Sequence, residues 1–219
     1  MTNEAQRRPE GTARIGFRSR IVPSLRRWLR SVYEKHANIL CCADLNERIP
    51  NIVPRIAITT RIAGLADAKQ LASIGAGTAE SYGHRFERGE ICTVAEVDDC
   101  VVAFVWITLG THVDSYLHTT IDPGLDGVLG YDAYTHPKAR GLRIRSLLFA
   151  EERRRGLEQG RKRLIFWLDR RVYHRAMRHW TREGFVSRPV RMITTRIFFG
   201  RFSLVRWTSL PKDILLDGT

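Results

Sequence analysis

The spacing of apolar residues near the start of the chain changes at Pro23. Residues 1–22 are rich in Arg, Gly and polar residues without apolar periodicity, which predicts a flexible basic tail. After Pro23 and Ser24, apolar or aromatic residues recur at intervals of three and four, which predicts an amphipathic helix. The residues of this predicted face are Leu25, Trp28, Leu29, Val32, Tyr33 and His36.

Shorter runs of alternating or continuous apolar residues follow and predict β-strands. They occupy residues 55–61, 91–97, 101–109, 128–136, 163–168, 192–199 and 202–207. Asp98, Asp99 and Cys100 join the second and third runs in a hairpin turn. Helical spacing is found at residues 67–74, 144–159 and 171–183, and the last of these helices ends at Gly184. Residues 110–127 form a long connection, and long connections in compact domains are often functional.

This order of elements predicts an α/β protein with a mixed central sheet of about six to seven strands and helices on both faces. An extra N-terminal amphipathic helix precedes it. The predicted division is a basic tail at 1–22, a helix and linker at 23–54, one main domain at 55–207 and a C-terminal tail at 208–219.

The composition excludes several classes of protein. No apolar run approaches the roughly 18 residues of a membrane-spanning helix, and the first ten residues are too polar for a signal peptide. The four cysteines have neither C-x-x-C spacing nor a nearby pair of histidines, so we expect reduced thiols and no metal site. These features predict a cytoplasmic protein.

The net charge of +13 is unevenly distributed along the chain. Residues 161–207 carry 13 basic and 2 acidic side chains. Arg171, Arg175, Arg178 and Arg182 form one basic stripe on the predicted helix, opposite an apolar face. Such a field attracts anions, which include nucleic acid, a membrane surface and the phosphates of a cofactor.

The turn before the helix at 144–159 has the features of an anion site. The first amides of a helix have no partners within the helix and point at any anion placed there. Gly141 allows close approach to the backbone, and basic side chains surround the turn. These are Lys138, Arg140, Arg143 and Arg145.

The sequence YDAYTHPKARGLRI at residues 131–144 resembles the cofactor-binding motif of the GNAT superfamily, whose usual form is [QR]-x-x-G-x-[GA] after a strand. The hairpin at 94–106 and the Glu183-Gly184-Phe185 sequence fit the same family, so the resemblance covers residues 55–207. The leading helix and Phe198-Phe199-Gly200 also resemble a bacterial GNAT group associated with polysaccharide gene clusters.

The resemblance implies an N-acyltransferase that uses acetyl-CoA or another acyl-CoA and needs no enzyme nucleophile. Amides from Lys138 to Ser146 would hold the diphosphate, and the thioester would lie beside Ala133 to Thr135. The implied cofactor-binding residues are Ala133, Tyr134, Thr135, Lys138, Ala139, Arg140, Gly141, Leu142, Arg143, Ile144, Arg145, Ser146, Tyr173 and Trp180.

Four residues depart from the family pattern, and one of them, Tyr173, stands where the family often has Asn. Lys138 replaces Gln or Arg, and Arg143 replaces a small residue, so the Arg143 side chain must point away from the diphosphate or replace amide contacts. Trp180 replaces the frequent general-acid Tyr. An indole donates no proton to a thiolate at neutral pH, so Trp180 is expected to pack in the core or against the cofactor.

Asp132 and Glu96 are the predicted general bases, and Asp132 is preferred because it lies on the strand that should carry the thioester. Further titratable groups are His136, one residue before Pro137, and His174 and His179 on the last predicted helix.

The predicted acceptor is the amine of a small molecule or sugar, contacted by residues 65–90 and 110–127. In the second segment the expected contacts are His112, Asp114, Tyr116 and His118.

The sequence also leaves other functions open. One alternative is a degenerate CoA-binding module without turnover. Another is a basic nucleic-acid-binding protein, although the sequence lacks a base-reading motif. Peripheral membrane contact through residues 23–37 and a homodimer are also compatible with the sequence.

Overall fold

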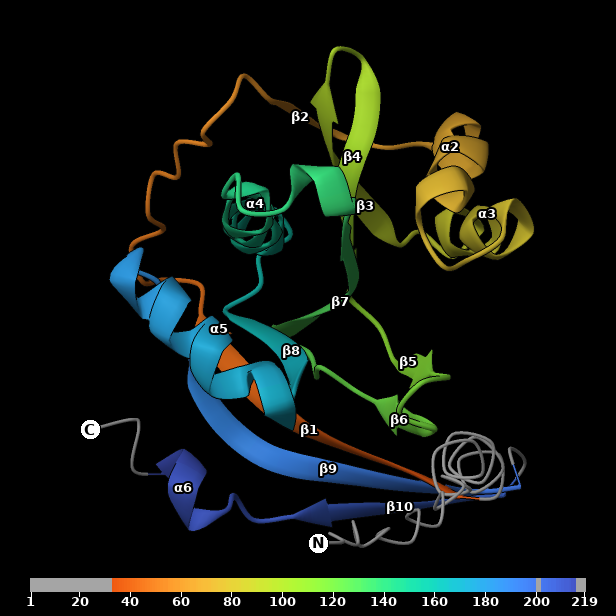
Figure 1. Ribbon diagram of the computed structural model, residues 1–219, viewed down its shortest axis with the longest axis vertical. Helices are drawn as coiled ribbons and strands as arrows, with labels where there is room; N and C mark the ends of the chain where they lie inside the picture. Colours follow the sequence, from red (N-terminus) through yellow and green to blue (C-terminus); the bar gives the residue numbers. More distant parts are fainter. Residues whose placement is uncertain (1–32, 200–201, 216–219) are drawn as a thin grey trace, which may run out of the picture.

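The computed structural model describes residues 33–199 and 202–215 (Figure 1). Eight strands form the main sheet, in the order β10-β9-β1-β8-β7-β4-β3-β2. Their bounds are β1 Tyr33–Asp44, β2 Thr59–Ile62, β3 Ile91–Val97, β4 Cys100–Thr108, β7 Gly127–Thr135, β8 Arg163–Asp169, β9 Arg188–Phe198 and β10 Phe202–Thr208. All neighbouring pairs are antiparallel except β7 and β8, which are parallel. The sheet is therefore mixed, as predicted, and has one strand more than expected.

The additional strand is β1, where part of a helix was predicted. Tyr33 and His36 lie on this strand, so their assignment to a helix was wrong, while residues 23–32 lie outside the described residues. The burial of β1 alternates at Ile39, Cys41 and Ala43, and its backbone pairs with β8 on one side and β9 on the other. Pairing on both edges overrides the helical spacing at the start of the segment. The sheet is thus built from residues on both sides of the predicted boundary at 55.

Helices α4 (Ile144–Glu158) and α5 (Arg170–Arg182) cover one face of the sheet (Figure 1). Phe149 of α4 stacks on Trp180 of α5, with ring centroids 4.4 Å apart. Both rings belong to a core that includes the buried side chains of β1 and β8. Ile144 and Leu148 are buried, and Leu147 packs on the core, as the apolar spacing predicted.

The opposite face is covered by α2 (Ala68–Ile74), α3 (Ala79–Glu87) and a small two-stranded sheet, β5 (His112–Asp114) with β6 (Thr119–Ile121). Phe104 and Trp106 point from β4 to this side, whereas Val105 packs with α4, as strand alternation requires. Helix α3 was not predicted, although Thr78 caps it and accepts a hydrogen bond from the Ser81 amide. The connection at 110–127 contains the β5–β6 pair rather than a continuous loop.

The hairpin between β3 and β4 was predicted correctly, and Asp98 and Asp99 both have positive φ, as this tight turn demands. The other short elements are the 3₁₀ turns Leu65–Asp67 and Pro137–Ala139 and helix α6 (Lys212–Leu215).

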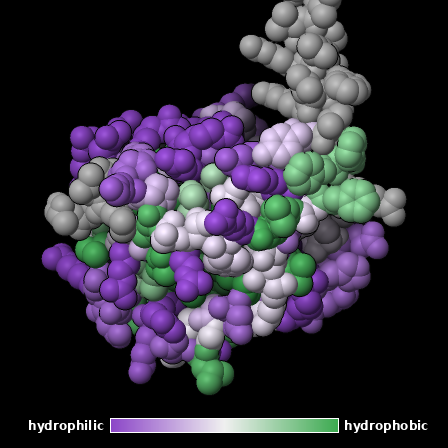
Figure 2. Space-filling view, turned by 90° about the horizontal axis from the view of Figure 1, so that it is seen from below, coloured by the Kyte–Doolittle hydropathy of each residue, from purple (hydrophilic) through white to green (hydrophobic). Residues whose placement is uncertain are grey.

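Hydrophilic residues cover much of the surface in Figure 2, and apolar side chains gather at one side of this view. Exposed apolar residues of β9, β10 and the residue after β9 are Val190, Phe198, Phe199, Phe202, Leu204 and Trp207. None of the helices in the described ranges has the length and apolarity needed to cross a bilayer.

Candidate functional site

The parallel strands β7 and β8 separate shortly after they meet. Their backbone pairing covers only Gly127 to Leu129 of β7 and ends at Leu129 with Ile165. Both strands continue for several residues beyond this point. The edge of β7 that faces β8 is therefore free of strand pairing from Gly130 onward, and its backbone groups are available to a ligand.

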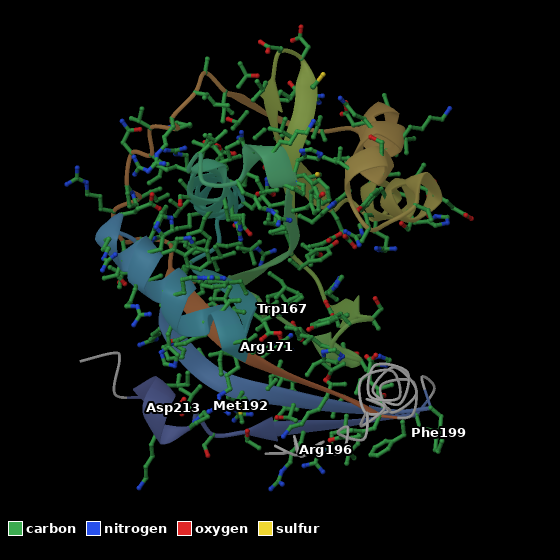
Figure 3. The ribbon with its side chains drawn as sticks, viewed as in Figure 1. Trp167, Arg171, Met192, Arg196, Phe199 and Asp213 are labelled. Atoms are coloured by element: carbon green, nitrogen blue, oxygen red, sulfur yellow. The ribbon has the colours of Figure 1, made fainter. Side chains whose placement is uncertain are left out.

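A cavity of about 950 Å³ lies at this separation and is lined by both strands. On the α4–α5 side its lining includes Arg145, Ala176 and Trp180. On the opposite side it includes Arg85 of α3 and His112 of β5. The cavity therefore reaches both faces of the sheet. Figure 3 shows Trp167 on β8 between α5 and the β5–β6 pair, and this side chain also lines the cavity.

Strand β7 carries a bulge where it passes the cavity. Asp132 and Ala133 lie opposite the single residue Val105, because the pairing shifts between Phe104 and Trp106. Asp132 has φ of 44°, a left-handed conformation that Asp tolerates better than most residues. Its carboxylate accepts a hydrogen bond from Arg85 at 2.6 Å. The predicted base Asp132 thus lies in the cavity wall, as an ion pair.

The turn before α4 is exposed at its predicted anion-binding positions. Pro137, Lys138, Arg140 and Gly141 are all exposed, and Gly141 has φ of 78°. The amides of the first turn of α4 have no acceptor among the described residues, although Ile144 and Ser146 are each only 1% exposed. Open amides at a helix N-terminus, beside a turn with basic side chains, form an anion-binding surface. The predicted motif therefore combines basic side chains, Gly141 with positive φ and a helix start whose amides have no partner among the described residues.

The structure shows how Arg143 is accommodated where the family pattern has a small residue. This residue has φ of 65°, and its side chain extends away from the turn. Its Nε donates to Glu183 Oε1 at 2.7 Å, and its Nη1 donates to the carbonyl of Val53 at 3.1 Å. The side chain thus links α4 to the end of α5 and leaves the amides of the turn open.

Trp180 is buried in the core and also contributes to the cavity wall. Arg145 lies over the rings of Phe149 and Trp180, at 5.6 and 5.7 Å from their centroids. The predicted cofactor residue Tyr173 is also buried in this core and is absent from the cavity lining. Trp180 therefore packs in the core and also presents part of its side chain to the cavity.

A buried carboxylate, Glu152, lies beneath the point where the strands separate. It accepts a hydrogen bond from Arg145 at 2.8 Å, and its other oxygen has no partner among the described residues. Burial raises the pKa of this carboxyl, and the Arg145 guanidinium opposes the shift. Gly130 faces the carboxylate so closely that a Cβ there would overlap Oε1. No pattern in the sequence marks Gly130 or Glu152 as part of the site.

The second predicted base, Glu96, lies outside the cavity lining. Its carboxylate accepts hydrogen bonds from Nε and Nη2 of Arg61 at 3.1 and 2.7 Å, and Arg61 also binds Asp67. This network joins β2, β3 and the turn after β2. The position of Glu96 therefore favours a structural role.

The predicted titratable histidines, His136, His174 and His179, also lie outside the cavity lining. His136 precedes the 3₁₀ turn, and its amide donates to Val102. His174 lies 3.8 Å from Asp213 on α6. His179 lies 3.4 Å from the hydroxyl of Ser146 and 3.5 Å from Glu183. None of the three reaches the cavity in this structure.

Several residues of the second predicted acceptor segment do reach it. His112, Asp114 and Tyr116 line the cavity, whereas His118 is at the exposed end of the β5–β6 pair and has φ of 51°. Asn38 also lines the cavity and was missed, because the segment containing β1 was interpreted as a helix and linker. In the described part of the chain no cluster of three or more His, Cys, Asp or Glu side chains has the arrangement of a metal site.

Solved structures similar to this chain share its fold at low sequence identity. A putative GNAT-family acetyltransferase from Novosphingobium aromaticivorans is 12% identical, with a TM-score of 0.53 over 81% of this chain and 66% of its own. A Drosophila protein is 13% identical, with a TM-score of 0.53 over 83% of this chain and 58% of its own. The glucosamine N-acetyltransferase region of a fungal multi-domain GH3 β-N-acetylglucosaminidase is 14% identical, with a TM-score of 0.52 over 78% of this chain and 22% of its own.

No protein-family model matches the sequence, and the search of curated proteins found no relative. The assignment thus depends on the fold, the order of the elements and the position of the turn before α4. On these grounds, this chain has the fold of the GNAT acetyltransferases.

Proposed function

We propose that this chain is an N-acyltransferase that transfers an acetyl or other acyl group from acyl-CoA to the amine of a small molecule or sugar. The observation that carries the proposal is the cavity between β7 and β8, which includes Arg145 in the first turn of α4 and reaches the opposite face of the sheet. A cofactor whose phosphates bind at α4 can extend into the cavity from one side. An acceptor can enter from the other.

The residues present fit such a cofactor. The diphosphate would lie on the turn at 137–141, where Lys138, Arg140 and Gly141 are exposed, next to the amides of the first turn of α4 that have no acceptor among the described residues. The unpaired edge of β7 from Gly130 to Thr135 offers backbone groups to the extended arm of the molecule. An acyl-CoA supplies a thioester, which an amine attacks directly. Backbone amides at the bulge are suited to stabilise the negative charge that forms on the carbonyl oxygen.

The glucosamine N-acetyltransferase among the similar structures makes amino sugars a reasonable first class of acceptor. Because identity to that protein is only 14%, the acceptor has to be found by a panel of amines with different shapes. Release of CoA thiol from acetyl-CoA reports turnover with any of them.

Gly141 and Gly160 provide a matched test of the cofactor site. Both have positive φ, and a Cβ built on either meets no atom within 4 Å. Gly141→Trp should lower the affinity for acetyl-CoA at least about tenfold in calorimetry, because the indole lies beside the open amides. Gly160→Trp, at the far end of α4, should leave it unchanged. Equal effects of the two substitutions, or no binding by the wild type, would contradict the proposal.

A CoA-binding module without turnover is the second candidate function. It is favoured by Trp180, which occupies the position of the frequent general-acid Tyr and is buried in the core. This candidate predicts acetyl-CoA binding without thiol release on any amine. Turnover with one amine excludes it.

A further inference from the structure

The β5–β6 pair brings a histidine and a carboxylate into the wall of the cavity. His112 and Asp114 both line it, on the side opposite α4 and α5. The His112 ring packs on Tyr131 of β7, with centroids 4.0 Å apart. Tyr131 is only two residues from Ala133, where the proposed thioester begins to run along β7. The imidazole is therefore on the acceptor side of the reacting bond.

The two side chains form a pair in a protected position. His112 Nε2 lies 3.7 Å from Asp114 Oδ2, and their side chains are only 11% and 9% exposed. The other oxygen of Asp114 accepts the Leu117 amide at 2.5 Å, which fixes the carboxylate within its turn. A carboxylate beside Nε2 favours the tautomer with the proton on Nε2 and leaves the lone pair on Nδ1.

The other acidic groups in or near the cavity are neutralised by cations or hydrogen bonds. Asp132 binds Arg85 at 2.6 Å, and Asp169 binds Arg171 at 2.6 Å. Glu90 accepts from the Tyr131 hydroxyl and lies 2.7 Å from Arg88. A carboxylate held by a guanidinium is a weakened proton acceptor, because accepting a proton breaks the ion pair. Two histidines that line the cavity have a carboxylate beside them, His84 with Glu87 at 2.9 Å and His112 with Asp114. The His84 side chain is 59% exposed, whereas that of His112 is 11% exposed and faces the strand that carries the proposed thioester.

A second group in the same cavity wall is available to a ligand. Asn38 is 1% exposed and lines the cavity; its side chain lies beside the Tyr116 hydroxyl, and its Nδ2 makes no hydrogen bond of standard geometry among the described residues. An unpaired buried amide is costly, so a ligand oxygen that accepts from it is favoured. A neutral donor of this kind suits a hydroxyl group.

We infer that this side of the cavity is the acceptor site for a primary amine bearing a hydroxyl group, and that His112, oriented by Asp114, is the general base. This inference rests on the proposed acyl transfer. Nδ1 of His112 takes one proton from the acceptor ammonium, and the neutral amine forms the N–C bond to the thioester carbon. The C–S bond then breaks, and the second nitrogen proton that is lost passes to the leaving sulfur through water. The imidazolium releases its proton to solvent.

The test compares His112→Gln with Asp132→Asn, using acetyl-CoA and the amine that the wild type acetylates fastest in the panel. His112→Gln should lower kcat/KM about 100-fold or more and remove the fall in kcat/KM on the acidic side of the pH profile. Added imidazole should restore part of the rate to His112→Ala. Asp132→Asn should keep the fall of kcat/KM at acidic pH.

The charged and titratable groups around His112 also affect the pH profile. They are Asp114 on its own strand and Tyr131 on β7, with Arg85 beyond the Tyr131 ring.

His118→Gln, at the exposed end of the β5–β6 pair, is the control for general effects on this element. Acetyl-CoA affinity should be the same in all variants. If His112→Gln keeps the wild-type pH profile, or if Asp132→Asn abolishes the acidic fall, the assignment of His112 is wrong although acyl transfer stands. If the wild type binds no acetyl-CoA and acetylates no amine, the proposed function fails and this assignment fails with it.

A separate measurement tests whether the acceptor amine needs a hydroxyl group. The wild type should prefer glucosamine over cyclohexylamine, and Asn38→Leu should reduce this preference about tenfold, because the lost amide no longer pairs with a hydroxyl. Equal rates of the wild type on the two amines would overturn this part of the inference.

Discussion

Nη1 of Arg85 donates to Oδ2 of Asp132 at 2.6 Å and so joins helix α3 to the bulge of β7. The guanidinium also lies about equally far from the rings of Tyr82, Trp106 and Tyr131, at 5.0, 5.1 and 5.1 Å. The cation thus fills an aromatic enclosure that borders the cavity, and the carboxylate fixes it there.

This arrangement predicts a structural role for the pair in addition to any contact with the acceptor. Arg85→Met should lower the free energy of unfolding by about 1–3 kcal/mol, because Asp132 then remains partly buried without its cation. Urea denaturation measures this change. Arg85→Met combined with Asp132→Asn should recover part of the loss, since no carboxylate is left unpaired. A double variant as unstable as the sum of the two single variants would contradict the coupling.

The parts of the fold that follow from short-range patterns were predicted correctly. The β3–β4 hairpin, helices α4 and α5 and the strands β7 and β8 follow from apolar spacing and turn residues within each segment. The turn at 137–143 was also predicted, because Pro137 and Gly141 mark it within one contiguous run of residues.

Helix α3 was missed despite its local Thr78 cap, whereas strand β1 and part of the site were missed because they depend on contacts between distant segments. Strand β1 is helix-like at its start by spacing alone, and only pairing with β8 and β9 makes it a strand. The Arg85–Asp132 pair joins residues 47 positions apart, on α3 and β7. Apolar spacing cannot detect such pairs. Because Asn38 lies on β1, the error in that element also hid a residue of the cavity wall.

Substitution of Arg143 tests whether its guanidinium takes part in binding the cofactor. Arg143→Gly retains a residue suited to φ of 65° but removes the ion pair with the buried Glu183. We expect a loss of about 1–3 kcal/mol in the free energy of unfolding, because the Glu183 carboxylate loses its cation. The affinity for acetyl-CoA should change by no more than about threefold, since the lost charge faces Glu183 and is screened by solvent.

Thermal or urea unfolding and calorimetry measure these two quantities on the same sample. Adding Glu183→Gln should restore part of the stability without a change in affinity. A large loss of affinity in Arg143→Gly would show instead that the guanidinium contacts the phosphates.

Gly130 is predicted to be intolerant of any side chain. A Cβ at this position would overlap Oε1 of the buried Glu152, which is held by Arg145 and has little room to move. Gly130→Ala should therefore lower the free energy of unfolding by about 1–3 kcal/mol, as overpacking does in other cores. Gly110→Ala is the control, because a Cβ there meets no atom within 4 Å and the residue is exposed.

Removal of the Glu152 side chain tests whether overlap with its carboxylate causes the loss of stability. In a double-mutant cycle, the cost of Gly130→Ala should be smaller in the Glu152→Ala background than in the wild type. Identical costs in both backgrounds would mean that the carboxylate is not what excludes a side chain at Gly130.

The network of Arg61 with Asp67 and Glu96 makes a prediction about pH. The hydrogen bonds from Arg61, helped by the Gly64 amide, hold the pKa of Asp67 below its ordinary value. A carboxyl with a lowered pKa in the folded state stabilises the protein above its unfolded pKa of about 3.9, and this stabilisation is lost as the pH falls through the folded pKa. Arg61→Met should therefore cost about 1 kcal/mol near pH 7, because the pair is partly exposed.

The difference between Arg61→Met and the wild type should shrink as the pH falls below about 4, where the Asp67 carboxylate of both proteins becomes protonated. Urea midpoints measured between neutral and acidic pH give this difference directly. Arg48→Met is the matched control, because Arg48 is exposed and the described part of the chain gives it no ion pair. A constant difference across the pH range would mean that Arg61 stabilises the protein through packing of its aliphatic stem and not through the two carboxylates.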